Sequence, residues 1–214
     1  MAYTLLDLRT KLTTQIGDPN LDSSVMTDAL NYTEQSIFNT FDLTLNSATQ
    51  TNAIAAGANV LTDALPSTLQ RITSLYISAP VGFAADLTDY FVKVKDFRSQ
   101  FPDAGAYTGI PQWWTYFTSI EFATLASEAV TIKLDYIKSV PLLSDTTDVP
   151  TIPQSFEELL ILGAKARIYE QKEDFDYAGQ FNNRYADLLE AFVTRYSTRQ
   201  VDNQMVIPGA RSKV

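Results

Sequence analysis

The sequence contains no cysteine and no histidine. Without cysteine, the chain has no disulfide framework, no thiolate metal ligand and no cysteine nucleophile. Without histidine, it has none of the imidazole-based acid–base or metal sites on which many enzymes depend. Any chemistry would therefore have to use carboxylates, lysine, tyrosine or serine.

Basic residues are scarce relative to acidic ones. The chain has 16 Lys and Arg residues against 25 Asp and Glu residues, which gives a formal net charge of -9. Proteins that bind nucleic acid by neutralising phosphates carry a clustered basic surface, and the sequence has no such cluster. We therefore expect no specific DNA binding. If copies of the chain surround DNA, acidic side chains that face it would repel the phosphates.

Long apolar runs and a secretory leader are also missing. The longest notable apolar run is residues 159–164, and residues 1–7 have neither a basic region nor a long apolar core. The apolar run is too short for a membrane span, and the first seven residues do not have the pattern of a signal peptide. We expect a protein that is made in the cytoplasm and does not contact a membrane. Its 214 residues, 45% of them hydrophobic, suffice for one substantial core with an appended lobe.

The first 45 residues have the pattern of two helices. Thr4 can cap the first helix, with Asp7 three residues later, and residues 17–20 (Gly-Asp-Pro-Asn) stop it. Asp22 and the two serines after it can cap a second helix that ends near Phe41. Because the connection is short, we expect an antiparallel helical hairpin over residues 1–45.

Residues 46–139 are rich in β-forming residues that glycine and proline separate into short segments. We expect a strand, a turn at Gly57 and a second strand between residues 46 and 61. Further strands are expected at residues 71–77, 113–117, 120–122 and 130–136, and a short helix over residues 86–101. In the last strand, apolar residues alternate with polar ones, which predicts one buried face formed by Val130, Ile132, Leu134 and Tyr136. This region is predicted to be a mostly antiparallel, β-rich insertion.

Two more helices are expected after this insertion. Pro141, Pro150 and Pro153 keep the chain extended until Ser155, which can form a capping box with Glu158. This helix should run to about residue 172, and its residues 163–164 (Gly-Ala) allow a neighbouring helix to approach closely. Apolar residues at helical spacing then predict a long final helix that ends near residue 198. The two helices would form a hairpin over residues 140–199, which packs on the first hairpin to give a four-helix core.

Trp113, Trp114 and Tyr116 form the densest aromatic cluster in the sequence. One interpretation is an alternating strand with one tryptophan in the core and the other shielding an edge. A second is an anchor at a subunit interface, and a third is a stacking platform for a glycan or a base. The sequence alone leaves these three alternatives open.

Clustered carboxylates raise the question of catalysis or metal binding. Residues 157–158 and 173–176 are acidic, but they fall in a helix's first turn and in a turn between helices, where acidic residues act as caps and solvated surface. The spacing of Asp18, Asn20 and Asp22 is similar to a calcium loop, but Ser23 stands where the loop needs glycine. We therefore predict no catalytic residue, no metal ligand and no cofactor, so the chain is not expected to be an enzyme.

The order of these elements identifies a similarity to a known family. The central strand, the proline-punctuated loop and the helix that follows resemble the head-to-tail adaptor (connector) proteins of tailed bacteriophages, of the tail tubular protein A type. The similarity extends over the opening helix pair and the closing helix. It is carried by a small set of residues: Gly17, Asp18, Leu65, Pro66, Pro111, Tyr136, Pro153, Phe156, Gly163 and Ala164.

The resemblance implies a structural virion protein. Copies of such adaptors form a ring, usually a dodecamer, that joins the portal protein to a tail or nozzle protein around the DNA channel through which the genome is ejected. The expected location is the virion neck, after assembly in the host cytoplasm. In this view the fold class is α+β. An alternative function is a soluble glycan-binding module that uses the aromatic cluster at residues 113–116.

Residues 200–214 lose all helical periodicity. They can be a solvated terminus or an extended arm that adds an apolar triplet to a partner. Because similar adaptors use this end to grip the portal, the resemblance favours the arm. The portal-binding candidates are Arg199, Met205, Val206, Ile207, Arg211 and Lys213.

Overall fold

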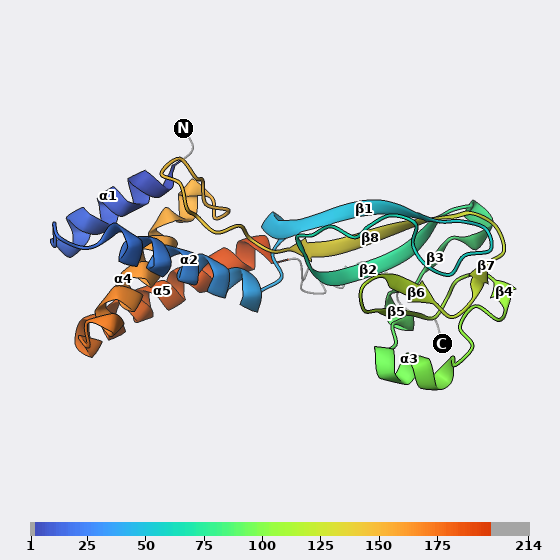
Figure 1. The fold of residues 1–214 in the computed structure, drawn as a ribbon. Coiled ribbons are helices and arrows are strands. Elements are labelled where there is room, and N and C mark those ends of the chain that lie inside the picture. Colours follow the sequence, from blue (N-terminus) through green and yellow to red (C-terminus); the bar gives the residue numbers. More distant parts are fainter. Residues whose placement is uncertain (1–2, 198–214) are drawn as a thin grey trace, which may run out of the picture. The chain divides into compact units, whose positions relative to one another are not determined.

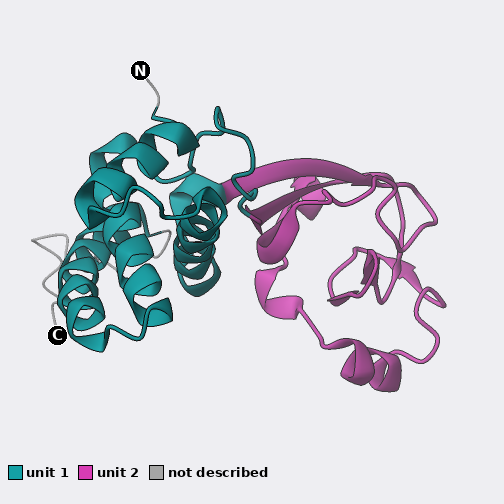
Figure 2. Ribbon diagram, turned by 60° about the vertical axis from the view of Figure 1, so that its left-hand side comes forward, with its two compact units in different colours: residues 1–46, 140–214 teal, residues 47–139 magenta. Residues whose placement is uncertain are grey.

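The computed structural model describes residues 3–197, which divide into two compact units. One unit combines residues 1–46 with residues 140–214, and the other consists of residues 47–139 (Figure 2). The first is helical and the second is built mainly from antiparallel strands (Figure 1). The predicted α+β class is therefore confirmed. Within residues 3–197, no helix has the length and apolar character that crossing a bilayer requires.

The helical unit begins as the sequence predicts. Thr4 and Asp7 form a reciprocal capping box at the start of the first helix, and Gly17 ends that helix in the left-handed conformation. Asp22 caps the next helix by accepting a hydrogen bond from the backbone N–H of Ser24. The helices of this unit are α1 (Leu5–Ile16), α2 (Ser23–Thr40), α4 (Glu157–Gln171) and α5 (Phe175–Tyr196), with 3-10 turns η1 (Thr44–Asn46) and η4 (Gln154–Phe156).

The start of α4 differs from the prediction. Ser155 does not form a capping box with Glu158, because Ser155 lies inside η4 and the N-cap is Phe156, which has no side-chain capping bond. Pro153 initiates this 3-10 turn, and the backbone N–H of Phe156 donates to its carbonyl. The tight turn thus displaces the N-cap of the helix by one residue, from Ser155 to Phe156.

Helix α4 is the most buried helix of the unit. It contacts α1, α2 and α5, and its side chains form one apolar core with theirs. Gly163 permits a close approach of α2 and α5, because an added Cβ would lie about 3.0 Å from both Thr33 Oγ1 and Tyr185 Cε2. The close approach that the sequence predicts at this glycine is confirmed.

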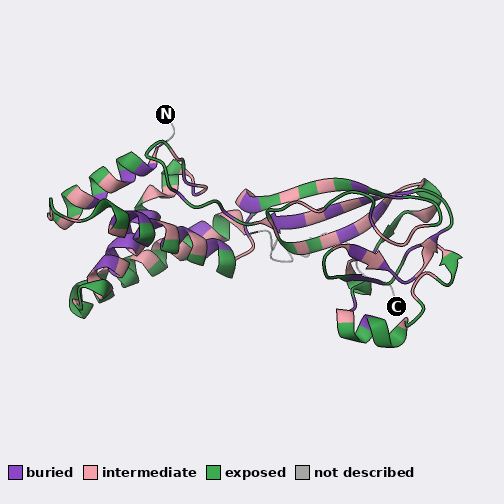
Figure 3. Cartoon of the chain, in the orientation of Figure 1, coloured by how far each residue is buried: buried purple, intermediate pink, exposed green. Residues whose placement is uncertain are grey.

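A four-stranded antiparallel sheet is the largest element of the β-rich unit. Its order is β1-β8-β2-β3, from β1 (Ser47–Ile54), β8 (Val130–Lys138), β2 (Leu69–Ala79) and β3 (Ala85–Asp86). The predicted alternation in β8 is confirmed, since buried residues recur at every second position from Val130 to Tyr136 (Figure 3). β8 lies between β1 and β2 and pairs with both along most of its length.

Smaller elements complete the β-rich unit. They are the hairpin of β5 (Trp114–Tyr116) and β6 (Ile120–Phe122), the parallel pair of β4 (Thr108–Gly109) and β7 (Leu125–Ala126), the helix α3 (Val94–Gln100), and the 3-10 turns η2 (Val81–Phe83) and η3 (Thr88–Tyr90).

Two predictions in this unit are wrong in part. The helix expected over residues 86–101 is confined to α3, because Leu87 packs into the main core of the unit whereas Phe97 packs into a separate cluster with Val92 and Ala123. The strand expected after Gly57 is reduced to a single bridge between Val60 and Glu121.

The core of the β-rich unit contains a polar residue that leads to a testable prediction. Asn52 on β1 lies opposite Ile132, is 2% exposed, and has no hydrogen-bond partner for either side-chain polar atom among the described residues. Replacing Asn52 with valine should raise the free energy of unfolding by about 1–2 kcal/mol, because the buried amide is removed and valine favours strands. Urea denaturation of the purified protein measures the change.

The matched control for this prediction is Asn59→Val. The side-chain amide of Asn59 donates to the carbonyl of Phe122, so its replacement should lower the free energy of unfolding. Loss of stability in Asn52→Val would contradict the prediction and would indicate that the Asn52 amide is hydrogen-bonded in solution.

Candidate functional site

The acidic residues that could suggest catalysis are engaged in structural contacts. Glu157 lies 2.6 Å from Lys11 Nζ, and Glu158 lies 3.8 Å from Arg184. Asp18 pairs with Lys172 at 2.9 Å and also accepts a hydrogen bond from the backbone of its own turn. Among residues 3–197, no cluster of three acidic side chains could hold a metal ion. The turn-and-cap interpretation of residues 18–22 is confirmed.

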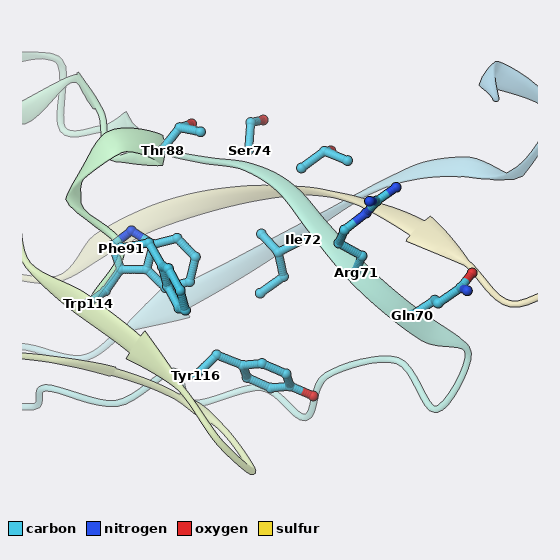
Figure 4. Close-up of a pocket in the computed structure, with 9 residues that line it drawn as sticks. Gln70, Arg71, Ile72, Ser74, Thr88, Phe91, Trp114 and Tyr116 are labelled. Atoms are coloured by element: carbon cyan, nitrogen blue, oxygen red, sulfur yellow. The ribbon is translucent and has the colours of Figure 1, made fainter. Parts of the chain in front are cut away.

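A pocket lies in the β-rich unit. Its volume is about 380 Å³. One side is formed by consecutive residues of β2, and the other by three aromatic side chains, of which Phe91 follows η3 and Trp114 and Tyr116 belong to β5 (Figure 4). The lining residues are Gln70, Arg71, Ile72, Thr73, Ser74, Thr88, Phe91, Trp114 and Tyr116.

The aromatic wall is held in place by backbone contacts. The indole N–H of Trp114 donates to the carbonyl of Leu87 at 2.7 Å, and the Trp114 carbonyl accepts from the N–H of Val92 at 2.8 Å. The ring of Phe91 lies 4.9 Å from that of Trp114. Figure 4 shows Tyr116 across the pocket from Ile72. Two members of the wall are partly exposed, Phe91 at 47% and Tyr116 at 36%, whereas Trp114 is buried.

The two tryptophans have different environments, although Trp113 lies before β5 and the strand itself does not alternate, since Trp114 and Thr115 are both buried. Trp114 is 4% exposed and belongs to the main core of the unit. Trp113 is 40% exposed and packs its ring against Tyr90 and Phe101. The predicted difference in burial between the two tryptophans is therefore confirmed, whereas the predicted alternation of the strand is wrong. Of the aromatic candidates at residues 113–116, the pocket brings together Trp114 and Tyr116 and does not include Trp113.

The predicted portal-binding residues lie outside the described residues. Arg199, Met205, Val206, Ile207, Arg211 and Lys213 all follow Ser197, the last described position. Their role stays a prediction.

A polar cluster on α2 was not found from the sequence. Asn31 and Gln35 bond the backbone of Leu143 and Val140, and Glu34 Oε1 accepts from the backbone N–H groups of Thr151 and Ile152 at 2.6 and 3.2 Å. These three residues share one helix face, because their spacing is i, i+3 and i+4. Together they hold residues 140–152, the loop that follows β8, on the helical unit.

Burial raises the pKa values of two groups around this loop, Glu34 and Tyr3. Desolvation raises the pKa of Glu34 from 4.5 to about 6, although the two backbone donors oppose this shift. Burial also raises the pKa of Tyr3, whose hydroxyl donates to the carbonyl of Ile152 at 2.5 Å. An acidic residue on the apolar stripe between Leu30 and Ile37 is the sequence signal that could have revealed this site.

Two comparisons with known proteins bear on the identity of the chain. A search of curated proteins finds no match to the chain. The model of the SU10 adaptor protein family matches residues 3–208, which is nearly the whole chain. The predicted similarity to phage adaptors is thus confirmed, and the chain belongs to the SU10 adaptor protein family, a family of structural phage proteins rather than enzymes.

Proposed function

We propose that the chain is a head-to-tail adaptor whose copies form a ring that joins the portal to the tail around the DNA channel. The family match over residues 3–208 is the observation that carries this proposal. Membership of this family makes the chain a virion component that contacts other head or tail proteins. The net charge of -9 suits a channel through which DNA passes without specific binding.

The two units suit two kinds of contact in such a ring. We propose that the helical unit acts as a four-helix scaffold, with the C-terminal arm as the contact to the portal, and that the β-rich insertion presents the surface toward the tail or nozzle protein. The extensive core that α4 shares with α1, α2 and α5 supports a rigid scaffold role. Copies related by head-to-tail contacts would close into a dodecamer that matches the portal.

Deleting residues 200–214 should abolish binding to portal-containing, DNA-filled capsids. The arm carries the apolar triplet at residues 205–207 and the cations Arg211 and Lys213, which can meet an acidic surface of the portal. Co-sedimentation of the purified chain with capsids, followed by electron microscopy of the neck, measures binding and the number of copies in the ring.

Two arm variants separate the possible contributions. Arg211→Ser with Lys213→Ser tests the charges, and Met205→Asp with Ile207→Asp tests the apolar triplet. Undiminished binding by the deletion variant would remove the arm from the interface. If the intact chain binds neither capsids nor tails, the adaptor function itself is refuted.

A further inference from the structure

The aromatic-walled pocket lies beside a part of β2 that has strand β8 on only one side. β3 pairs with β2 only at Tyr76 and Ile77. At Leu75, the N–H donates to Thr88 Oγ1 and the carbonyl accepts from Leu87. Within residues 3–197, no strand lies on the side of residues 72–74 that faces away from β8. The pocket therefore borders a sheet edge that can accept one more strand.

A strand edge next to an apolar pocket is a recognised way to bind an extended peptide. Main-chain hydrogen bonds hold the added strand, and alternate side chains enter the pocket. Here Ile72, Phe91 and Trp114 offer apolar contact, and Tyr116 forms the opposite wall (Figure 4). A volume of about 380 Å³ accommodates one or two aliphatic side chains. The expected ligand is an extended segment with apolar residues at alternate positions.

We propose that this site binds residues 201–207 of a second copy of the chain. Met205 and Ile207 are alternate residues and would point to the same side of a strand. Pro208 follows them and cannot donate a backbone hydrogen bond, so it would end the added strand.

The end of the described chain supports this occupant. Ser197, the last described residue, has extended backbone angles (φ -61°, ψ 133°) and forms an antiparallel bridge with Leu43. Residues 198–204 could span about 23 Å if extended, so the chain length does not confine the triplet at residues 205–207 to its own helical unit.

The contact would control when the C-terminal segment is free to bind the portal. This part of the inference rests on the proposed adaptor function. The same segment is proposed to grip the portal, so the pocket would hold it until the portal displaces it. The apolar triplet would thereby be kept from water before assembly. The contact between the segment and the pocket forms without the portal, so it can be tested with the purified chain alone. Binding to the portal is tested separately with capsids, and either result can be negative without the other.

Peptide binding to the intact protein tests the contact. The receptor is the full-length chain with Met205→Asp and Ile207→Asp, which disables its own segment, and the probe is a fluorescein-labelled peptide of residues 198–214. Fluorescence anisotropy should show saturable binding. Tyr116→Ala in the receptor should weaken it by about tenfold or more, as for an interface anchor.

Matched variants exclude unspecific effects. Tyr107→Ala in the receptor removes another exposed tyrosine of the same unit that does not line the pocket, and should leave the affinity unchanged. A peptide with Met205→Asp and Ile207→Asp should not bind. Equal peptide binding by the Tyr116→Ala receptor and the receptor with Tyr116 would overturn the proposal. So would the absence of binding by the unmodified peptide. A glycan array that shows glycan binding by the chain, and its loss in Tyr116→Ala, would also overturn it.

Sedimentation velocity of the unmodified chain tests the origin of the segment. Association that increases with concentration, and that disappears in the Met205→Asp, Ile207→Asp variant, is the expected result for a second copy. If the unmodified chain stays monomeric at every concentration and also fails to bind the labelled peptide, its own segment occupies the pocket. That result would refute binding between copies.

Discussion

Replacing Gly163 with alanine should lower the free energy of unfolding by about 1–3 kcal/mol. The new Cβ would overlap with Thr33 Cγ2 and lie about 3.0 Å from Tyr185 Cε2, so α2 and α5 must both shift away from α4. Alanine favours a helix over glycine by about 1 kcal/mol, which offsets only part of this cost. Thr33 cannot move easily, because it is 4% exposed and donates a hydrogen bond to Ala29. Urea denaturation followed by circular dichroism measures the loss.

The chain provides a matched control for the Gly163 variant. Gly179 lies in the exposed part of α5, and a Cβ there would meet no atom within 4 Å. Gly179→Ala should therefore raise the free energy of unfolding by about 0.5–1 kcal/mol. Adding Thr33→Ala to Gly163→Ala should recover part of the loss, because the clashing methyl group is gone. Equal stability changes at the two glycines would contradict close packing at Gly163.

The ends of the first helix could be predicted from the sequence because capping and terminating residues act on neighbours only a few positions away. Thr4, Asp7 and Gly17 specify the start and end of α1 through their own hydrogen bonds and backbone angles. The alternation in β8 likewise reflects one buried face. Such features need no knowledge of distant residues, and the structure has them where the sequence places them.

Predictions failed where distant contacts decide the local structure. Leu87 and Phe97 have helical spacing, but they are buried in two different clusters, so one continuous helix cannot serve both. The pocket combines residues near positions 72, 90 and 115, and no spacing in the sequence links these three segments. The sequence draws attention to the aromatic cluster at residues 113–116, but only the structure shows that Trp114 and Tyr116 line the pocket and that Trp113 does not.

Replacing Glu34 with alanine should lower the free energy of unfolding at pH 5 by about 2–4 kcal/mol. Glu34 is 1% exposed, and its loss leaves the N–H groups of Thr151 and Ile152 without their acceptor. The loop at residues 140–152 would lose one of its attachments to α2. Asp28→Ala is the control, because Asp28 is an exposed acidic residue on the same helix and should change stability by less than about 0.5 kcal/mol.

Stability should also depend on pH through this residue. The pKa of Glu34 rises from 4.5 to about 6 on folding, so between these values the folded state binds more protons than the unfolded state. The contribution of Glu34 is therefore fully present below pH 4.5 and is lost as the pH rises through 6. The loss amounts to about 2 kcal/mol, from 1.36 kcal/mol for each pKa unit.

Glu34→Gln isolates this effect, because the glutamine carbonyl can still accept from Thr151 and Ile152 but does not ionise. Other carboxyls act in the opposite direction, since hydrogen bonds lower the pKa of Asp7, Asp22 and Asp148. These groups are the same in both proteins and cancel in the difference. Relative to the unmodified protein, the glutamine variant should gain about 2 kcal/mol between pH 4 and pH 8. A difference that stays constant over this range would mean that Glu34 titrates alike in the folded and unfolded chains, and its attachment of the loop would then be independent of pH.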